Sequence, residues 1–160
     1  MNLRRLFSSP IRFLAARPSR AGTDAKPGLL RGWLARLLGD EGEGLAARHL
    51  RAQGFKILAR QYRTALGEID LIALDGDCVV FVEVKTRRSR AAGLPVEAVD
   101  RAKQAKLTRL ALAYLKRKGL LNHSARFDVV AIVWSEGQRE PEIVHYRNAF
   151  PPVGEGQMFS

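Results

Sequence analysis

The feature that most constrains this chain is a charged hairpin in its most hydrophobic part. The stretch GEIDLIALDGDCVVFVEVKTR, residues 67–87, contains two runs typical of strands on either side of the polar turn Asp75-Gly76-Asp77. Side chains alternate between the faces of a strand, so residues two apart share a face. Four charged residues then interrupt apolar faces: Glu68, Asp70, Glu83 and Lys85. Unpaired carboxylates are costly to bury, so other groups must compensate for them.

The length of the turn decides which of these side chains face one another. A two-residue loop, the commonest hairpin connection, puts Asp70 and Glu83 on one face. With the loop at residues 76–77, Asp70 lies opposite Glu83 and Glu68 lies opposite Lys85. Moving the loop back by one residue places Glu68 opposite Glu83, and a three-residue loop separates the two acids onto opposite faces. Facing like charges are destabilising, so the shared face needs a cation.

Two kinds of cation can compensate. Lys85 neutralises one charge, and a hard divalent cation neutralises more, because Mg²⁺ takes oxygen ligands from carboxylates and substrate phosphate. The alternative is a solvated face with a Glu–Lys ladder, as antiparallel sheets often have. Against this alternative, Ile72 and Phe81 continue the same face with apolar side chains. The opposite face is predicted to be core, formed by Ile69, Leu71, Val80, Val82 and Val84.

Periodicity surrounds the hairpin with helices and further strands. Residues 29–39 are predicted to form a short helix that ends at Gly39, and residues 40–54 a second helix that ends at Gly54. The other expected elements are a strand at 55–64 with Phe55, Ile57 and Ala59 on one face, a long helix at 96–118, a strand at 125–134 and an edge strand at 141–146. The order αβββαββ from residue 40 indicates an α/β (α+β) domain with a mixed sheet.

The charge of the chain is concentrated at its N-terminus. The net charge is +11 and the pI about 10.6, which favours an anionic partner such as nucleic acid or an acidic membrane surface. We therefore divide the chain into a basic arm and linker at 1–39, a domain at 40–147 and a tail at 148–160. Arginines and apolar residues alternate irregularly in the arm, so a membrane-surface anchor is a weaker alternative. No run approaches the roughly 18 apolar residues of a membrane span, and the lone Cys78 favours a reducing, cytoplasmic location.

Five ordered blocks resemble the bacterial YraN family. They are GEG-x2-A at 42–47, GEIDLIA at 67–73, FVEVKTR at 81–87, a basic helix start at 101–106 and RFDVVAI at 126–132. The spacing Asp70-x12-Glu83-x-Lys85 is also similar to the core of the PD-(D/E)xK superfamily, the restriction-endonuclease-like nucleases. The resemblance covers about residues 40–147. It implies a mixed central sheet flanked by helices, in agreement with the order read from periodicity.

The resemblance also implies an activity. It predicts a Mg²⁺- or Mn²⁺-dependent nuclease that hydrolyses phosphodiester bonds in DNA, branched or single-stranded forms included. Asp70, Glu83 and Lys85 would be catalytic, and the two acids would bind the metal. Similarity to Holliday-junction resolvases adds Glu43 as a helix-borne ligand and suggests a homodimer. The alternative for Glu43 is a residue in the first turn of a helix, stabilised by the macrodipole. Glu68 is a further metal candidate.

Nucleic-acid contacts are expected around these acids, since phosphates need cationic partners. The candidates are Arg87, Arg88 and Arg90 after the hairpin and Lys103, Gln104 and Lys106 at the start of the long helix. For each of them a solvated surface position is the alternative. The competing function is a nucleic-acid-binding module with a nuclease-like fold and no turnover. The combination of Asp70, Glu83 and Lys85 favours the enzyme, because a pure binder needs no acids in a basic groove.

Overall fold

The computed structural model of the chain describes residues 27–87, 99–135 and 137–154, and for residues 27–38 the backbone alone. Residues 1–26 of the predicted arm lie outside the described residues. Seven elements follow one another: α1 (Pro27–Ala52), β1 (Lys56–Thr64), β2 (Gly67–Asp75), β3 (Cys78–Arg87), α2 (Arg101–Lys118), β4 (Ala125–Val133) and β5 (Glu142–Phe150). The predicted order αβββαββ is confirmed.

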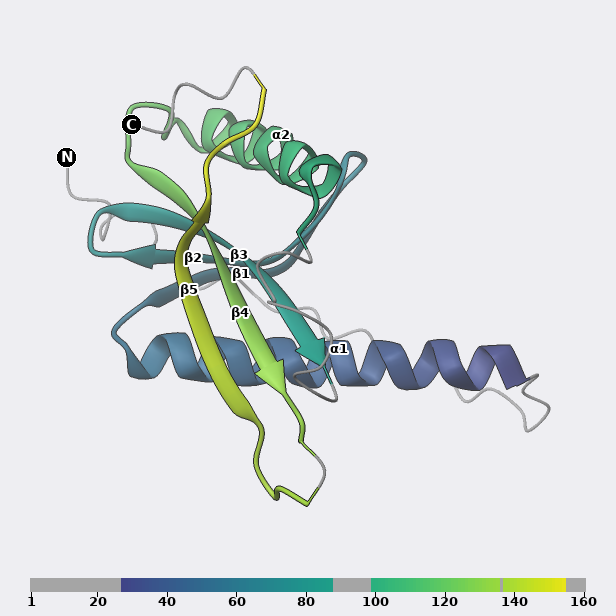
Figure 1. The fold of residues 1–160 in the computed structure, drawn as a ribbon. Helices are drawn as coiled ribbons and strands as arrows, with labels where there is room; N and C mark the ends of the chain where they lie inside the picture. The colour runs from purple at the N-terminus through teal and green to yellow at the C-terminus, as the bar shows by residue number, and fades with distance from the viewer. Residues whose placement is uncertain (1–26, 88–98, 136, 155–160) are drawn as a thin grey trace.

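The strands form one mixed sheet with the order β1-β2-β3-β4-β5. Strand β4 runs parallel to β3, with Val129 beside Glu83, and the other neighbours are antiparallel. A parallel pair needs a crossover connection, and here α2 lies within that connection. Helix α1 lies along one face of the sheet and α2 over the other, and the N-terminal half of α1 extends beyond the strands (Figure 1). The predicted mixed α+β class is therefore confirmed.

Each helix covers its own hydrophobic cluster. The α2-side cluster includes Ile69, Ile72, Leu74, Val79, Phe81, Leu107, Leu110, Tyr114, Phe127, Val129 and Phe150. The α1-side cluster comprises Ala46, Ala47, Leu50, Phe55, Leu71, Ala73, Val80, Val82, Val130 and Ile132. Each large apolar side chain buried in them contributes about 1.5–3 kcal/mol. Since both faces of the hairpin are covered, the alternative of a solvated Glu–Lys face is wrong.

The hairpin turn has the predicted two-residue loop. Asp75 pairs with Cys78, so residues 76–77 form the loop, and the register continues to Leu71 opposite Val82. Gly76 has a φ of 60°, a left-handed conformation that such tight turns require. The ladder ends one position before Asp70 and Glu83, which would be opposite each other if the register continued.

Helix α1 differs from the prediction at Gly39. The helix is continuous from Pro27 to Ala52, so the prediction that Gly39 ends a short helix is wrong. A glycine inside a helix costs about 1 kcal/mol relative to alanine, which does not stop a long helix. The predicted division of the chain after residue 39 falls inside α1. The helix ends before Gly54, whose φ of 91° suits a stop, as predicted.

Helix α2 begins at Arg101, whereas the sequence predicted a start at residue 96. Residues 96–98 lie outside the described residues, and Asp100 is the N-cap. Its side chain accepts a hydrogen bond from the backbone N–H of Lys103 at 2.8 Å, which satisfies one of the free donors of the first turn. The helix ends as predicted at Gly119, where φ is 68°. The capping aspartate thus fixes the start that apolar periodicity misplaced.

Two residues lie on the face opposite to the predicted one. Phe55 and Ile57 pack on the α1 side, but Ala59 packs on the α2 side because the register of β1 shifts between Ile57 and Ala59. Ile69 was predicted to share a face with Leu71, yet Ile69 packs in the α2-side cluster and Leu71 in the α1-side cluster. The alternation of side chains is interrupted in both cases, at the register shift in β1 and at Asp70 in β2.

Strand β5 is longer than predicted. It continues past the expected end at Tyr146 to Phe150, across the predicted start of the tail at residue 148. The backbone N–H of Asn148 donates to Asp128 at 2.8 Å, and the ring of Phe150 stacks on Phe127 with centroids 4.9 Å apart. Buried partners on β4 therefore hold a segment that lacks periodicity of its own.

Candidate functional site

The predicted acids lie where β2 and β3 separate. The Asp70 Oδ2 atom accepts a hydrogen bond from the backbone N–H of Val84 at 2.7 Å. Ile69 and Leu71, on either side of Asp70, pack on opposite faces of the sheet. The side chain of Asp70 is therefore turned toward the neighbouring strand, where it bonds to β3. This position brings it close to Glu83, which the two-residue turn predicted.

Among the predicted site residues that the structure describes, Glu83 is the most enclosed, with 4% of its surface exposed. Its Oε1 atom accepts from the Lys85 Nζ atom at 2.8 Å and from the Lys103 Nζ atom at 3.1 Å. Its Oε2 atom is buried and has no hydrogen-bond partner among the described residues. The predicted compensation by Lys85 is thus found, and α2 supplies a second ammonium group that the sequence assigned to nucleic acid.

Glu43 reaches the same region from α1. It lies in the middle of a helix that begins at Pro27, so the alternative of a first-turn residue is wrong. The glycine before it permits a close approach, because a Cβ atom on Gly42 would collide with the hydroxyl of Thr86 at the end of β3. Glu43 is buried, and its Oε2 atom lacks a hydrogen-bond partner among the described residues. We call Glu43, Asp70 and Glu83 the acidic cluster.

The cluster is short of positive charge. Burial, with the charges of Glu83 and Glu43, raises the pKa of Asp70 to about 7, although the Val84 hydrogen bond and Lys103 oppose this shift. Burial also raises the pKa of Glu43, against a hydrogen bond from Gln61. A carboxylate near a like charge in a poorly solvated site resists ionisation. A bound cation would relieve both carboxylates.

The donor set fits a hard divalent cation held by few protein ligands. Mg²⁺ keeps several water molecules and is usually bound by one or two carboxylates plus substrate phosphate. Asp70 and Glu83 supply such carboxylates, and buried oxygens of Glu83 and Glu43 are without partners among the described residues. Within those residues no group of three or more His, Cys, Asp or Glu side chains is arranged to hold a metal. The predicted set of four ligands is therefore not assembled.

Glu68 forms an exposed ion pair of its own, although its charge contributes to the raised pKa of Glu43. Its Oε2 atom pairs with the Arg63 Nε atom at 3.0 Å on the surface of β1 and β2. The alternation that changes face at Asp70 separates it from Lys85, its predicted partner. Of the predicted metal ligands, Glu68 is the one engaged in an ordinary exposed ion pair.

The residues predicted to bind nucleic acid differ in exposure and in their contacts within the chain. Lys106 is exposed on α2 and lies against Gly67, where a Cβ atom would collide with its ammonium end. The amide of Gln104 donates to the carbonyl of Val99 at 2.8 Å, so this donor is engaged within the chain. Arg87 is half-buried at the end of β3. Arg88 and Arg90 lie outside the described residues.

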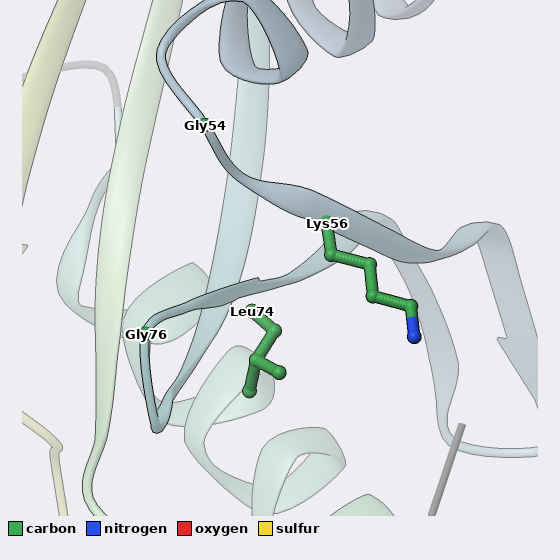
Figure 2. A pocket seen from close by; sticks show the side chains of 4 residues that line it. All are labelled: Gly54, Lys56, Leu74 and Gly76. Carbon is green, nitrogen blue, oxygen red and sulfur yellow. The ribbon is translucent and has the colours of Figure 1, made fainter. Parts of the chain in front are cut away.

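Two hollows that are lined by described residues lie elsewhere on the molecule. One, of about 230 Å³, is lined by Gly54, Lys56, Leu74 and Gly76, between the start of β1 and the hairpin turn (Figure 2). The other, of about 430 Å³, lies between the start of α2 and the segment after β5, and is lined by Arg101, Gln104, Pro151, Pro152, Val153 and Gly154. Neither hollow is lined by a residue of the acidic cluster.

Sequence reasoning missed a buried ionic network around Asp128, which has no exposed surface. Its carboxylate accepts from Arg126 Nε at 3.0 Å, His145 Nε2 at 2.9 Å and the backbone N–H of Asn148 at 2.8 Å. Arg126 also donates to Asp75 at 2.8 Å. The available signal was the charged pair inside the apolar strand RFDVVAI. The carboxylates of Asp128 and Asp75 both accept hydrogen bonds from charged donors. These hydrogen bonds join β4 to β5 and to the hairpin turn.

Comparison with known proteins identifies the family. The description of the matching family is "Uncharacterised protein family UPF0102", and the match covers residues 42–132, from the helix of Glu43 to the strand of Asp128. The chain belongs to the UPF0102 family. All three residues of the acidic cluster lie inside the matched segment.

Several UPF0102 proteins are similar over most of the chain. A UPF0102 protein of Alkaliphilus metalliredigens is 44% identical over 117 residues, which are 73% of this chain and 100% of the relative. One of Rhodococcus jostii is 49% identical over 113 residues, 71% of this chain and 95% of the relative. One of Rhodopirellula baltica is 48% identical over 120 residues, 73% of this chain and 72% of the relative. In the described part of this chain, neither helix has the length and apolar character needed to cross a membrane.

Proposed function

We propose that this UPF0102 protein is a divalent-metal-dependent nuclease that hydrolyses phosphodiester bonds in DNA, as the YraN and PD-(D/E)xK resemblance implies. The observation that carries the proposal is the acidic cluster: three buried or half-buried acids from three elements, with a raised pKa at Asp70 and with oxygens on Glu43 and Glu83 that have no partner among the described residues. A structural role alone would favour complete pairing, as at Asp128. Excess negative charge without full pairing is typical of a site that awaits a cation.

Each side chain of the site has a separate role in the proposed reaction. Asp70 and Glu83 bind Mg²⁺ or Mn²⁺, and the Val84 N–H orients the Asp70 carboxylate. When bound, the metal lowers the pKa of a water molecule and stabilises charge on the phosphoryl group. Lys85 and Lys103, which Glu83 holds at the cluster, bind phosphate oxygens and orient the attacking water. The two lysines also limit the repulsion between the acids and the phosphate backbone.

Helix α2 supports a nucleic-acid partner. It contains no acidic residue and seven basic ones: Arg101, Lys103, Lys106, Arg109, Lys116, Arg117 and Lys118. Four of these, Lys106, Arg109, Lys116 and Arg117, are exposed and spaced to lie along one side of the helix; we call them the basic stripe. At a rise of about 1.5 Å per residue, the stripe is about 16 Å long, the length of about five phosphates of one DNA strand. Lys103 connects the stripe with the acidic cluster.

Cleavage of a panel of labelled substrates tests the proposal. The panel contains duplex, single-stranded, flapped and four-way DNA, and RNA, each with Mg²⁺ or Mn²⁺. We expect metal-dependent cleavage that falls by about 10²–10³-fold in Lys85→Met, because a group that stabilises transition-state charge is lost. Glu83→Gln should also lose activity. Glu41→Gln is the matched control, since Glu41 is exposed on α1 and outside the cluster.

The second candidate is a binding module without turnover. It is favoured by the two ammonium groups that already neutralise Glu83 and by the absence of a three-ligand group in the described residues. A folded wild type that binds DNA and cuts none of the substrates would contradict the nuclease and support this module. Cleavage that persists unchanged in Glu83→Gln would identify a contaminating enzyme.

We place the protein in the cytoplasm, where a nuclease would meet bacterial DNA.

A further inference from the structure

Gln61 has a backbone conformation that is rare for its residue type. Its φ is 48°, in the left-handed region. Only a few per cent of residues other than glycine have a positive φ, and Asn, Asp and His are the types enriched there. The conformation costs about 1–3 kcal/mol and persists where the surroundings hold it in place. A glutamine inside a strand therefore needs a specific reason to adopt it.

The strained residue lies beside the acidic cluster. In the β1–β2 ladder, Arg60 pairs with Leu71 and Tyr62 pairs with Ile69. Gln61 is consequently opposite Asp70. The alternation of side chains is interrupted on both strands at this one pair, so the conformation of Gln61 and the sideways direction of Asp70 belong to the same irregularity.

The neighbours of Gln61 show the change of face on β1. The ring of Tyr62 packs edge-on against Tyr114 of α2, with centroids 5.2 Å apart. The guanidinium of Arg60 lies on the α1 side, 3.9 Å from the place where a Cβ atom on Gly44 would be. In a regular strand these two side chains would share a face. The change of face leaves Gln61 to point toward α1.

The amide of Gln61 is oriented by three partners. Its Nε2 atom donates to the Asp40 Oδ1 atom at 2.6 Å, and its Oε1 atom accepts from the Arg63 Nη2 atom at 3.4 Å. A side-chain hydrogen bond from Gln61 also opposes the raised pKa of Glu43, whose Oε2 atom has no hydrogen-bond partner among the described residues. Asp40 and Arg63 thus fix which end of the amide meets Glu43. One oxygen of Glu43 is held and the other stays available.

We propose that Gln61 is a positioning residue that holds the Glu43 carboxylate for a divalent cation at the acidic cluster. This inference rests on the proposed function, because it assigns Gln61 a task at that same site. Side chains that orient metal ligands are worth about 10–100-fold in metal affinity. The strained backbone of Gln61 directs its side-chain amide from β1 toward Glu43 on α1.

Manganese affinity of the full chain, measured by calorimetric titration, tests the inference. Gln61→Gly removes the amide and also relieves the backbone, because glycine adopts positive φ freely. We expect Gln61→Gly to fold with an unchanged or higher melting temperature and to bind Mn²⁺ about 10–100-fold more weakly. Gln61→Met removes the amide but keeps the strain, and should show the same loss with an unchanged or lower melting temperature. A merely structural role would make affinity follow stability.

The chain offers a matched control for strain relief. Asn148, with a φ of 49°, is the other described non-glycine residue in this conformation, and its backbone bonds Asp128 away from the cluster. Asn148→Gly should leave Mn²⁺ affinity unchanged. Wild-type affinity in Gln61→Gly would overturn the inference and leave the proposed function standing. Absence of Mn²⁺ binding by the folded wild type would overturn both.

Discussion

The side-chain carboxylate of Asp70 accepts the hydrogen bond that the backbone N–H of Val84 would otherwise donate within the β2–β3 ladder. Continuing the register of the hairpin would pair Val84 with Ile69, but the ladder stops at Leu71 and Val82. The Val84 N–H instead donates to the Asp70 carboxylate at 2.7 Å. A side chain thus replaces a main-chain acceptor at the point where the two strands separate. This exchange opens the sheet and holds Asp70 next to Glu83.

The first prediction follows from the cost of that exchange. Asp70→Asn should raise the free energy of unfolding of the metal-free protein at pH 8 by about 1–3 kcal/mol, since it removes a carboxylate whose pKa is raised to about 7. The asparagine oxygen can still accept from Val84. Urea unfolding in EDTA measures the change. Asp77→Asn, at the exposed turn, is the control and should change stability by less than about 0.5 kcal/mol.

The same residue gives this gain a pH dependence. A group with a raised folded-state pKa contributes stability below its unfolded pKa, about 3.9 for Asp, and loses that contribution as the pH rises through the folded value. The advantage of Asp70→Asn should therefore be small below about pH 4 and grow up to about pH 7. A constant advantage across this range would contradict the assignment of the raised pKa to Asp70.

A second prediction concerns the close approach of α1 to β3. Gly42→Ala should destabilise the protein by about 1–3 kcal/mol through crowding against the Thr86 hydroxyl. In a Thr86→Ala background the collision is absent, and the same change should become neutral or stabilising by up to about 1 kcal/mol, the helix-propensity gain. Thermal unfolding of the four proteins of this cycle measures both effects. Equal effects in the two backgrounds would exclude the packing explanation.

The basic stripe supplies a third prediction. Replacing Lys106 and Arg109 with glutamine should weaken DNA binding and lower the slope of log K against log salt by about 0.9 per lost phosphate contact. Fluorescence anisotropy at several salt concentrations measures this slope. The control is Arg48→Gln with Arg51→Gln, two exposed residues of α1 that remove the same net charge. If both pairs change the slope equally, α2 is not the binding surface.

Asp128 supplies a fourth prediction, with the opposite sign of pH dependence. Burial acts to raise its pKa, but hydrogen bonds from His145, Arg126 and the Asn148 N–H outweigh burial and hold the pKa below its usual range. A lowered pKa contributes stability above the unfolded value that is lost as the pH falls through the folded value. Asp128→Asn should cost about 3–5 kcal/mol at pH 7, because it breaks a buried ionic network.

Urea unfolding from pH 7 to pH 3 separates this effect from simple loss of packing. Wild-type stability should fall steeply below about pH 4, where an unfolded aspartate takes up a proton. The Asp128→Asn variant should be less stable at pH 7 and lose less on acidification. A parallel loss in both proteins would show that other carboxylates control acid unfolding.

Local patterns predicted the element order, the two-residue turn and Lys85 as a compensating charge, because each depends on residues close in sequence; the predicted partner of Lys85 was Glu68, whereas the structure pairs Lys85 with Glu83. They failed where a distant contact decides the geometry. The face of Ile69 depends on the irregular pair of Gln61 and Asp70, which side-chain alternation cannot anticipate. The end of β5 depends on Asp128, a buried partner on the neighbouring strand.

The composition of the acidic cluster was also only partly accessible from sequence. Asp70 and Glu83 come from one hairpin, so a register argument brings them together. Lys103 reaches Glu83 from a helix across the sheet, and nothing in its local sequence distinguishes it from the other basic residues of α2. Glu68 is two residues from Asp70 but pairs with Arg63, because the strand changes face between them.

Titration of Mn²⁺ into the metal-free protein at pH 8, followed by calorimetry, tests most directly whether the acidic cluster is a cation site. Wild type and Asp70→Asn are compared at equal concentration. We expect one saturable Mn²⁺ site in the wild type. Asp70→Asn should weaken Mn²⁺ binding by at least about 10–100-fold, the loss typical of changes around metal ligands. No binding by the folded wild type, or equal binding by both proteins, would contradict a cation site at the acidic cluster.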